Sequence, residues 1–236
     1  MAVCGVIFDV GGTLVWSNHD KFEGACAWTA VNVFRSHGFR SDPETLWRDL
    51  VSVRQAFSKE GPDYRQLHTT RWAIGEVAAC HHTLEDRFLD EVESAFVTPE
   101  AHGSVALPGI LEVIDQLKGR VELGVVSNTR SHRLIEKTLE HLGVRAVFDP
   151  LVTSAGCGWR KPSPNIFREV LAVWKLPAEQ LVMVGDSPTK DVLGAKALGL
   201  RTIWLNLGAA EGLSSADAVA KTPSQILDIL AAWSTG

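Results

Sequence analysis

Cysteine is scarce in this sequence, and its placement excludes two kinds of site. The 236 residues include four cysteines with no CxxC pair among them, and these are Cys4, Cys26, Cys80 and Cys157. A zinc site usually needs ligands at close, regular spacing, and a disulfide framework needs a denser set of cysteines. We therefore expect the reduced, buried thiols of a cytoplasmic protein.

The sequence also lacks an excess of positive charge and a long apolar run. The 23 Lys and Arg residues are outnumbered by 28 Asp and Glu residues, so the formal net charge is −5. Nucleic-acid binding usually requires a basic surface, and a membrane-spanning helix requires about 20 apolar residues. We find neither, and no basic leader precedes an apolar core at the start. We expect no nucleic-acid partner and no membrane partner, and the oligomeric state is left open.

Short apolar runs alternate with segments of helical periodicity over most of the chain. The strand-like runs cover residues 3–8, 122–126, 181–184 and 200–205. Apolar residues recur at helical spacing in residues 110–117, 134–142, 166–173 and 192–198. This alternation predicts an α/β fold built on a doubly wound, Rossmann-like parallel sheet.

One long segment interrupts the alternation. Residues 16–106 contain no comparable strand-like run and are rich in Ala, Glu, Arg and Trp, with breaks at Gly38, Pro43, Gly61, Pro62 and Pro99. We interpret this segment as an inserted α-helical domain that includes a helix at residues 66–79. Residues 1–15 and 107–236 then form the α/β core domain.

Polar residues stand where the predicted strands end. They are Asp9 after the first run, Ser127 and Asn128 after the second, and Asp186 after the third, while Lys161 lies in a loop between the last two. The carboxyl ends of parallel strands face one crevice, so we expect these side chains to lie together. A single aspartate there could simply cap a helix, but several polar positions with both signs of charge favour a functional site.

The side chains at these positions suit phosphoryl transfer. The carboxylates of Asp9 and Asp186 can hold a hard cation such as Mg²⁺, with Asp191 joining or supporting that site. Lys161 and Ser127 can contact the oxygens of a phosphoryl group, which needs mainly positioning and charge neutralisation. Asp9 can act as the nucleophile, giving an aspartyl-phosphate that water later cleaves.

Four segments resemble, in the right order, the four motifs of the haloacid dehalogenase-like (HAD) hydrolase superfamily. They are residues 8–14 (FDVGGTL), 126–128 (VSN), 160–167 (RKPSPNIF) and 184–191 (VGDSPTKD). The inserted segment is similar to the helical cap that one HAD subgroup carries after the first motif. The resemblance implies a Mg²⁺-dependent phosphatase, a phosphoric monoester hydrolase, that acts on a small phosphorylated molecule.

The resemblance also implies a role for each motif residue. Asp9 corresponds to the covalent nucleophile and a magnesium ligand, and Asp186 corresponds to a second ligand. Asp191 is similar to a further ligand or to a support for the ligands, and the backbone carbonyl of Gly11 is implied as a ligand too. The implied phosphate-binding residues are Gly11, Gly12, Thr13, Ser127, Asn128 and Lys161, of which Ser127 and Lys161 also take part in catalysis.

The first motif departs from the family pattern at one position. The usual phosphatase motif carries a second aspartate, which protonates the leaving group and later activates water, and Gly11 stands there instead. A well-placed acid or base contributes about 10²–10⁴-fold in rate. Three interpretations remain open: a phosphatase for good leaving groups such as aryl or acyl phosphates, a proton donor elsewhere such as Asp20 or His68, or a catalytically impaired binding or regulatory protein.

Two other activities of the superfamily also lack this aspartate. Phosphonate hydrolases need a desolvated cap lysine, and the insert offers only Lys21, close to the first motif, and Lys59, in a predicted linker. Haloacid dehalogenases use no metal, and their fourth motif usually lacks the Gly-Asp-Ser pattern of residues 185–187. The acidic residues Asp186 and Asp191 therefore favour phosphate chemistry, with a dehalogenase as the alternative.

Overall fold

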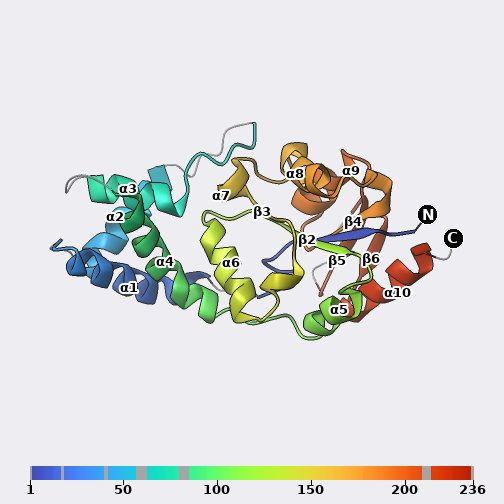
Figure 1. The fold of residues 1–236 in the computed structure, drawn as a ribbon, viewed down its shortest axis with the longest axis horizontal. Coiled ribbons are helices and arrows are strands. Elements are labelled where there is room, and N and C mark those ends of the chain that lie inside the picture. Colours follow the sequence, from blue (N-terminus) through green and yellow to red (C-terminus); the bar gives the residue numbers. More distant parts are fainter. Residues whose placement is uncertain are drawn as a thin grey trace.

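The computed structural model of the chain describes residues 2–16, 19–39, 42–56, 63–79, 85–208 and 214–234. Figure 1 shows an elongated molecule. A sheet flanked by helices lies at one end, and a bundle of helices lies at the other. We call the first the sheet part (residues 2–15 and 107–234) and the second the helical part (residues 16–106), in each case meaning the described residues. None of the described helices is long and apolar enough to cross a bilayer.

Within the described ranges, six parallel strands form one sheet in the order β3-β2-β1-β4-β5-β6. The strands are β1 (Gly5–Phe8), β2 (Glu122–Ser127), β3 (Leu151–Thr153), β4 (Leu181–Gly185), β5 (Arg201–Leu205) and β6 (Ala218–Ala220). This arrangement confirms the predicted parallel α/β fold. The edge strands β3 and β6 were not predicted, because three residues each are too few to give a recognisable apolar pattern.

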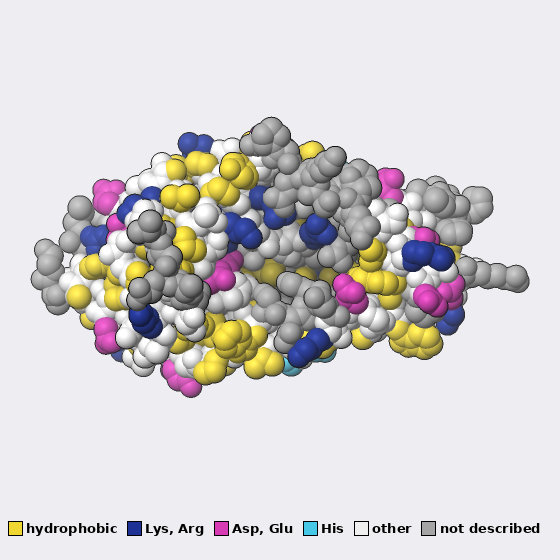
Figure 2. Space-filling model, turned by 180° about the vertical axis from the view of Figure 1, so that it is seen from behind, with side chains coloured by type: hydrophobic (Ala, Val, Ile, Leu, Met, Phe, Trp, Pro, Cys, Tyr) yellow, Lys and Arg dark blue, Asp and Glu magenta, His cyan; other side chains and the backbone are white. Residues whose placement is uncertain are grey.

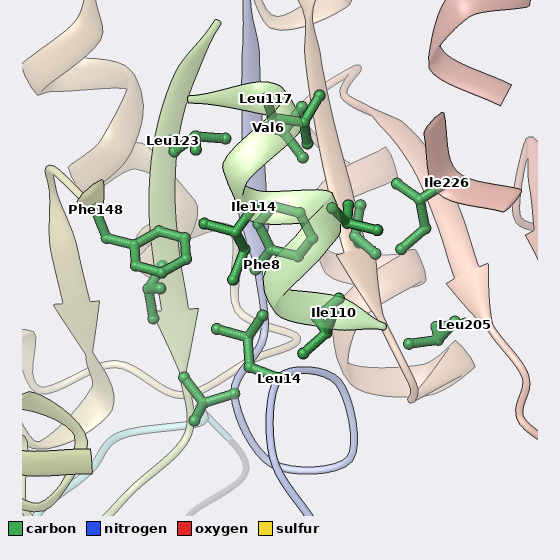
Figure 3. Packing of buried hydrophobic residues seen from close by; sticks show 14 of the residues in the cluster. Val6, Phe8, Leu14, Ile110, Ile114, Leu117, Leu123, Phe148, Leu205 and Ile226 are labelled. Carbon is green, nitrogen blue, oxygen red and sulfur yellow. The ribbon is translucent and has the colours of Figure 1, made fainter. Parts of the chain in front are cut away.

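Alternate side chains of each strand point to opposite faces of the sheet, and each face carries its own helices. Phe8 of β1 packs with Ile114 on one face, as Figure 3 shows, and its ring lies edge-on to Phe148 with centroids 6.2 Å apart. Ile7, the preceding residue, packs on the other face with Phe167. The first face is covered by α5 (Ile110–Leu117), α6 (His132–His141) and α10 (Pro223–Ser234), and the second by α8 (Pro164–Trp174) and α9 (Leu193–Lys196).

Shorter helical turns lie in the connections of the sheet part. They are η2 (Arg145–Val147), α7 (Ser154–Cys157), η3 (Ala178–Gln180) and η4 (Pro188–Val192). The last of these is a π-helical turn that runs directly into α9, so the predicted helix at residues 192–198 begins inside an irregular turn. The turn follows β4 and so belongs to the site edge of the sheet.

The helical part has its own apolar core. Its elements are η1 (His19–Phe22), α1 (Glu23–Ser36), α2 (Pro43–Ala56), α3 (Thr70–Ala79) and α4 (Asp86–His102). Fully buried side chains such as Phe34, Ile74 and Val92 join these helices in a cluster separate from those of the sheet. As the sequence predicts, Gly38 follows the end of α1 with a positive φ of 85°, and Pro43 begins α2.

Two local predictions in the helical part are wrong. The helix α4 does not break at Pro99 but continues to His102. Pro99 leaves the carbonyl of Ala95 without its helical donor, and the hydroxyl of Thr29 donates to that carbonyl at 2.7 Å instead. The helix α3 begins at residue 70 rather than 66, because the segment before it pairs with another loop, where Arg65 forms an antiparallel bridge with Trp159.

The two chain segments that connect the parts lie side by side. Val15 forms an antiparallel β-bridge with Ala106, and the N–H of Leu107 donates to the carbonyl of Leu14 at 2.9 Å. The chain therefore leaves the sheet part after β1 and returns to it at the same place. This connection is what an insertion after the first strand requires.

Candidate active site

The strand register brings the predicted polar residues to one edge of the sheet. Phe8, the last residue of β1, pairs with β2 two residues before Ser127 and with β4 two residues before Asp186. Asp9 follows directly after Phe8, and β1 lies in the middle of the sheet. All three side chains thus emerge at the carboxyl ends of the strands, where parallel α/β folds place their ligand sites.

Lys161 contacts two of the carboxylates at this edge of the sheet. Its ammonium lies 2.5 Å from Oδ1 of Asp9 and 2.7 Å from Oδ1 of Asp191, and it donates to the carbonyl of Val126 at 2.8 Å. The side chains of the three charged residues are at most 10% exposed. Water therefore screens these ion pairs only weakly, and each charge depends on the others for compensation.

The loop that carries Lys161 is fixed by Asn128. We call residues 158–161 the lysine loop. Oδ1 of Asn128 accepts the N–H of Lys161 at 2.7 Å, and its Nδ2 donates to the carbonyl of Lys161 at 3.0 Å. Both ends of the Asn128 amide are thus used in placing Lys161, and the phosphate contact expected of Asn128 stays a prediction.

The turn η4 buries Asp191. The N–H of Ser187 donates to Oδ2 of Asp191 at 2.9 Å, and the Ser187 hydroxyl accepts the N–H of Lys190 at 3.3 Å. As a result, Asp191 is held in contact with Lys161, while Asp186, at the end of β4, is exposed to the cavity.

The first motif packs tightly against the fourth. Gly12 has a φ of +81°, and a Cβ there would lie 2.3 Å from Oδ2 of Asp186, so only glycine fits. Thr13 is fully buried, and its hydroxyl has no hydrogen-bond partner in the described part of the chain. Gly11 lines the cavity, whereas Gly12 and Thr13 are not among the described residues of its wall.

Burial and like charges shift the ionisation of this cluster. Burial raises the pKa of Asp9 to about 7, an effect that Lys161 opposes and the neighbouring carboxylates reinforce. Burial also raises the pKa of Asp186, and the charge of Asp191 adds to the effect. Burial alone would lower the pKa of Lys161, but Asp191 and Asp9 outweigh it and raise that pKa. The cluster therefore contains more carboxylates than cations, and Asp9 and Asp186 hold a proton more tightly than ordinary carboxyls do.

The three carboxylates fit a hard divalent cation. Asp9, Asp186 and Asp191 each offer an oxygen, and these oxygens lie within 4.8 Å of one another. Oxygens on opposite sides of a Mg²⁺ ion are about 4.2 Å apart, close to this spacing. One ammonium against three carboxylates leaves two negative charges without a partner in the cluster, which one divalent ion would neutralise.

A cavity of about 660 Å³ opens over these side chains. Its charged floor comes from the sheet part, and the helical part contributes Trp16, Phe22, Thr70, Phe96, Val97, Glu100, Gly103 and Ser104. Figure 2 shows Lys and Arg side chains, in dark blue, around a hollow near the middle of one face. The volume falls in the range of small-molecule sites, and both parts of the chain enclose it.

The cavity wall contains one carboxylate that the sequence analysis missed. Glu100 of α4 lines the cavity, and apart from the three carboxylates above it is the acidic residue of the described wall. A glutamate on a helix gives no signal in the sequence, because exposed helix faces normally carry such residues. Arg130, Arg160 and Lys190 also line the cavity; Arg160 and Lys190 lie within the third and fourth motif segments, where no role was assigned to them, and Arg130 follows the second segment.

Of the two proton donors considered from the sequence, only His68 has a described side chain. His68 packs against the edge of Trp72 with centroids 4.8 Å apart, and it is not among the described lining residues. Burial lowers its pKa, and Arg130 adds to that effect. Asp20 belongs to η1, but its side chain lies outside the described part of the structure, as does Lys59.

Fold and site together define an α/β enzyme with an acidic candidate centre at the carboxyl ends of its strands. The chain belongs to the haloacid dehalogenase-like hydrolase family, because the family model matches residues 5–199. This match confirms the resemblance seen in the four motifs and makes the protein a hydrolase.

Known proteins similar to this chain include both phosphatases and a dehalogenase. A glyceraldehyde 3-phosphate phosphatase from Pyrococcus abyssi is 27% identical over 212 residues, which are 86% of this chain and 81% of that protein. A 2-haloacid dehalogenase from Pseudomonas syringae superposes with a TM-score of 0.70 at 22% identity, over 98% of this chain and 99% of that one. A HAD phosphatase from Thermococcus onnurineus gives a TM-score of 0.67 at 21% identity, over 96% and 97%. These two structures confirm the fold and do not choose between the two activities.

Proposed function

We propose that this hydrolase is a Mg²⁺-dependent phosphatase that takes the phosphoryl group of a small phosphorylated molecule onto Asp9. The observation that carries the proposal is the buried contact of Lys161 with Asp9 at 2.5 Å, beside two further carboxylates of which Asp191 is buried and Asp186 faces the cavity. Dehalogenation needs no metal, so a cluster of three carboxylates favours phosphate chemistry over it.

In the first step, Oδ2 of Asp9 attacks the phosphorus, and the bond between phosphorus and the ester oxygen breaks. Lys161 holds Oδ1 and so aims the other oxygen while compensating the charge of the carboxylate. The hydroxyl of Ser127, which lines the cavity, would donate to an oxygen of the moving phosphoryl group. The ester oxygen leaves with the electron pair of the broken bond and takes up a proton.

In the second step, water attacks the phosphorus of the aspartyl-phosphate and the bond to Asp9 breaks. Inorganic phosphate leaves, a proton of the water goes to phosphate or solvent, and the Asp9 carboxylate is restored. Bound Mg²⁺ would supply positive charge beside the phosphoryl oxygens. Asp9, Asp186, Asp191 and the carbonyl of Gly11 are the groups that would hold it.

Gly11 limits which phosphate esters can react, according to their leaving groups. Without an acid at that position, esters with good leaving groups should react best, because they need little protonation. Glu100 is the carboxylic acid of the helical part that reaches the cavity wall, so it can supply a proton to poorer leaving groups. These two possibilities differ in their response to removing Glu100.

We assign the helical part the role of a cap. It forms one wall of the cavity, and both of its connections to the sheet part run side by side at Val15 and Ala106. Such an attachment allows the helical part to move as a unit and to select the molecule that enters. The relative from Pyrococcus abyssi is named for glyceraldehyde 3-phosphate, which makes that ester the first substrate to test.

The test is phosphate release from p-nitrophenyl phosphate and from a panel of phosphorylated metabolites, with Mg²⁺ and with a chelator. We expect turnover that the chelator abolishes and that Asp9→Asn removes, while the matched Asp115→Asn, on the exposed face of α5, turns over like wild type. Equal rates for wild type and Asp9→Asn across the panel would exclude Asp9 as the nucleophile. Halide release from a 2-haloacid in the presence of chelator would point to dehalogenation instead.

A further inference from the structure

The non-helical segment before α3 is hydrogen-bonded directly to the lysine loop. We call residues 63–69 the bridging segment. The N–H of Gln66 donates to the carbonyl of Gly158 at 2.9 Å, and the N–H of Arg160 donates to the carbonyl of Tyr64 at 2.8 Å. These two bonds attach the helical part to the main chain that immediately precedes Lys161.

One side chain of the bridging segment reaches further into the site edge. Oε1 of Gln66 accepts Nη1 of Arg160 at 2.8 Å and the hydroxyl of Ser154 at 3.3 Å. Its Nε2 donates to the carbonyl of His68 at 2.7 Å, which holds the amide in this orientation. Gln66 is half-buried, so these bonds compete only partly with water.

Ser154 carries the connection to the loop after β2. Its hydroxyl accepts the N–H of Thr129 at 2.9 Å, and its single hydrogen is shared between the carbonyl of Thr129 at 2.8 Å and Oε1 of Gln66 at 3.3 Å. Thr129 follows Asn128, whose amide holds the main chain of Lys161 from the other side. Gln66 thus touches both loops that fix Lys161, one through Arg160 and one through Ser154.

We propose that Gln66 is a positioning residue: when the helical part covers the cavity, its amide locks the lysine loop and the loop after β2 in the arrangement that sets Lys161 against Asp9. Gln66 does not touch the reacting atoms in this scheme. Its effect should reach the chemical step through Lys161, so placement of the cap and readiness of the catalytic lysine are coupled. The inference rests on the proposed phosphatase function.

The experiment compares Gln66→Ala, Gln66→Glu and Ser154→Ala by p-nitrophenyl phosphate kinetics and by amide hydrogen exchange of residues 154–161. For Gln66→Ala we expect kcat about tenfold lower, the factor for one or two lost part-buried hydrogen bonds, with KM changed less than about twofold. Exchange of the lysine loop should rise by a similar factor. Gln66→Glu keeps the acceptor oxygen for Arg160 but loses the donor to the carbonyl of His68, so it should recover part of kcat.

Two further variants separate positioning from loss of fold. Ser154→Ala should lower kcat similarly, and the double variant with Gln66→Ala should be little worse than either single one, because they belong to one network. Gln116→Ala, on the exposed face of α5, is the matched control and should behave like wild type. Thermal unfolding of each variant checks that the fold is kept.

An unchanged kcat in Gln66→Ala overturns the inference, whether or not exchange rises, and so does a rise in KM alone. Equal losses in Gln66→Glu and Gln66→Ala also overturn it, because the acceptor would then not matter. If wild type turns over no ester in the panel, the proposed function fails separately. Binding of inorganic phosphate with Mg²⁺ then decides: weaker binding by Gln66→Ala supports the positioning role, and equal binding overturns it.

Discussion

The two parts of the molecule bring different kinds of side chain to one cavity. The sheet part contributes charge, held rigidly at strand ends by Lys161 and its carboxylate partners. The helical part is built around apolar residues such as Phe34 and Ile74 and contributes apolar side chains such as Phe22 and Phe96 to the wall, beside polar ones such as Glu100. In the proposed scheme the chemistry resides in the sheet part, while the helical part controls which molecules reach it and, through Gln66, how Lys161 is positioned.

The largest expected effect comes from removing the cation at the centre of the sheet part. Lys161→Met should lower kcat by at least about 10³-fold, because Asp9 loses both its aim and its compensating charge. It should also destabilise the protein by about 3–5 kcal/mol, since Asp9 and Asp191 would then face each other unpaired. Steady-state kinetics and urea unfolding measure the two effects.

Added Mg²⁺ gives this prediction its control. The ion should restore part of the stability of Lys161→Met, because it neutralises the same carboxylates, but not the activity. Lys118→Met, at an exposed position, should change neither quantity. If Lys161→Met kept its activity, the proposed division between the two parts would be wrong, because the charged cavity floor of the sheet part would then not carry out the chemistry.

The second effect tests whether the helical part is held by its own core. Ile74 is fully buried in the helical cluster, and Ile74→Ala should cost about 2–5 kcal/mol. We expect faster amide exchange in α1 to α4 and little change in β1 and β4. The matched variant Ile110→Ala, also fully buried but under the sheet, should speed exchange in the strands. Uniform changes throughout the chain in both variants would mean that the two cores unfold as one.

The same contrast decides how much could be predicted from the sequence. In the sheet part, buried parallel strands are continuous apolar runs, and their carboxyl ends must meet, so β1, β2, β4 and β5 and the cluster around Asp9 follow from the pattern. The edge strands β3 and β6 escaped because they are short, and the π-helical turn η4 because its irregularity depends on burying Asp191. Features that do not show in the spacing of apolar residues could therefore not be predicted from the sequence.

In the helical part the sequence predicted helices, one of them at residues 66–79, and some of the breaks between them, but no contacts. The continuation of α4 through Pro99 depends on a hydroxyl from α1, at Thr29, that no local rule can supply. The bridging segment is not helical, and Gln66 and Tyr64 instead find backbone partners in the lysine loop, far away along the chain. Glu100 gave no signal for the same reason, since its place in the wall depends on how the two parts meet.

The third effect restores the missing acid to the sheet part. Gly11 lines the cavity, so Gly11→Asp adds a carboxyl close to where the leaving group departs. Turnover of alkyl phosphates should rise by about 10²-fold, with little gain for p-nitrophenyl phosphate, whose leaving group needs no proton. The ratio of the two kcat/KM values is the measurement.

Glu100→Gln is the partner experiment for the helical part. A rise in Gly11→Asp together with no loss in Glu100→Gln would mean that Glu100 is not the proton donor and that the wild type lacks the acid which Gly11→Asp adds to the sheet part. No rise in Gly11→Asp with a loss confined to alkyl phosphates in Glu100→Gln would place it in the helical part. Either result sharpens the division between the two walls of the cavity.

The smallest effect concerns a carboxylate of the sheet part that lies outside the cavity wall. Asp217 accepts Nζ of Lys196 at 2.6 Å, and the N–H and hydroxyl of Thr202 at 2.9 and 2.8 Å. Partial burial alone would raise the pKa of Asp217, but these hydrogen bonds outweigh it and lower that pKa. A carboxyl with a lowered pKa stabilises the fold above its unfolded value and loses that contribution as the pH falls through the folded value.

Asp217→Asn should therefore cost about 1 kcal/mol at pH 7, a figure kept small because the side chain is 37% exposed and partly screened. Urea unfolding at pH 7, 5 and 3.5 should show a similar difference between variant and wild type at the first two values and a smaller one at the last, below the ordinary carboxyl pKa of about 3.9. Phosphatase activity at pH 7 should not change, because Asp217 is not among the described residues of the cavity wall. A difference that grows on acidification would contradict the lowered pKa, and a loss of activity would mean that this sheet edge is coupled to the site.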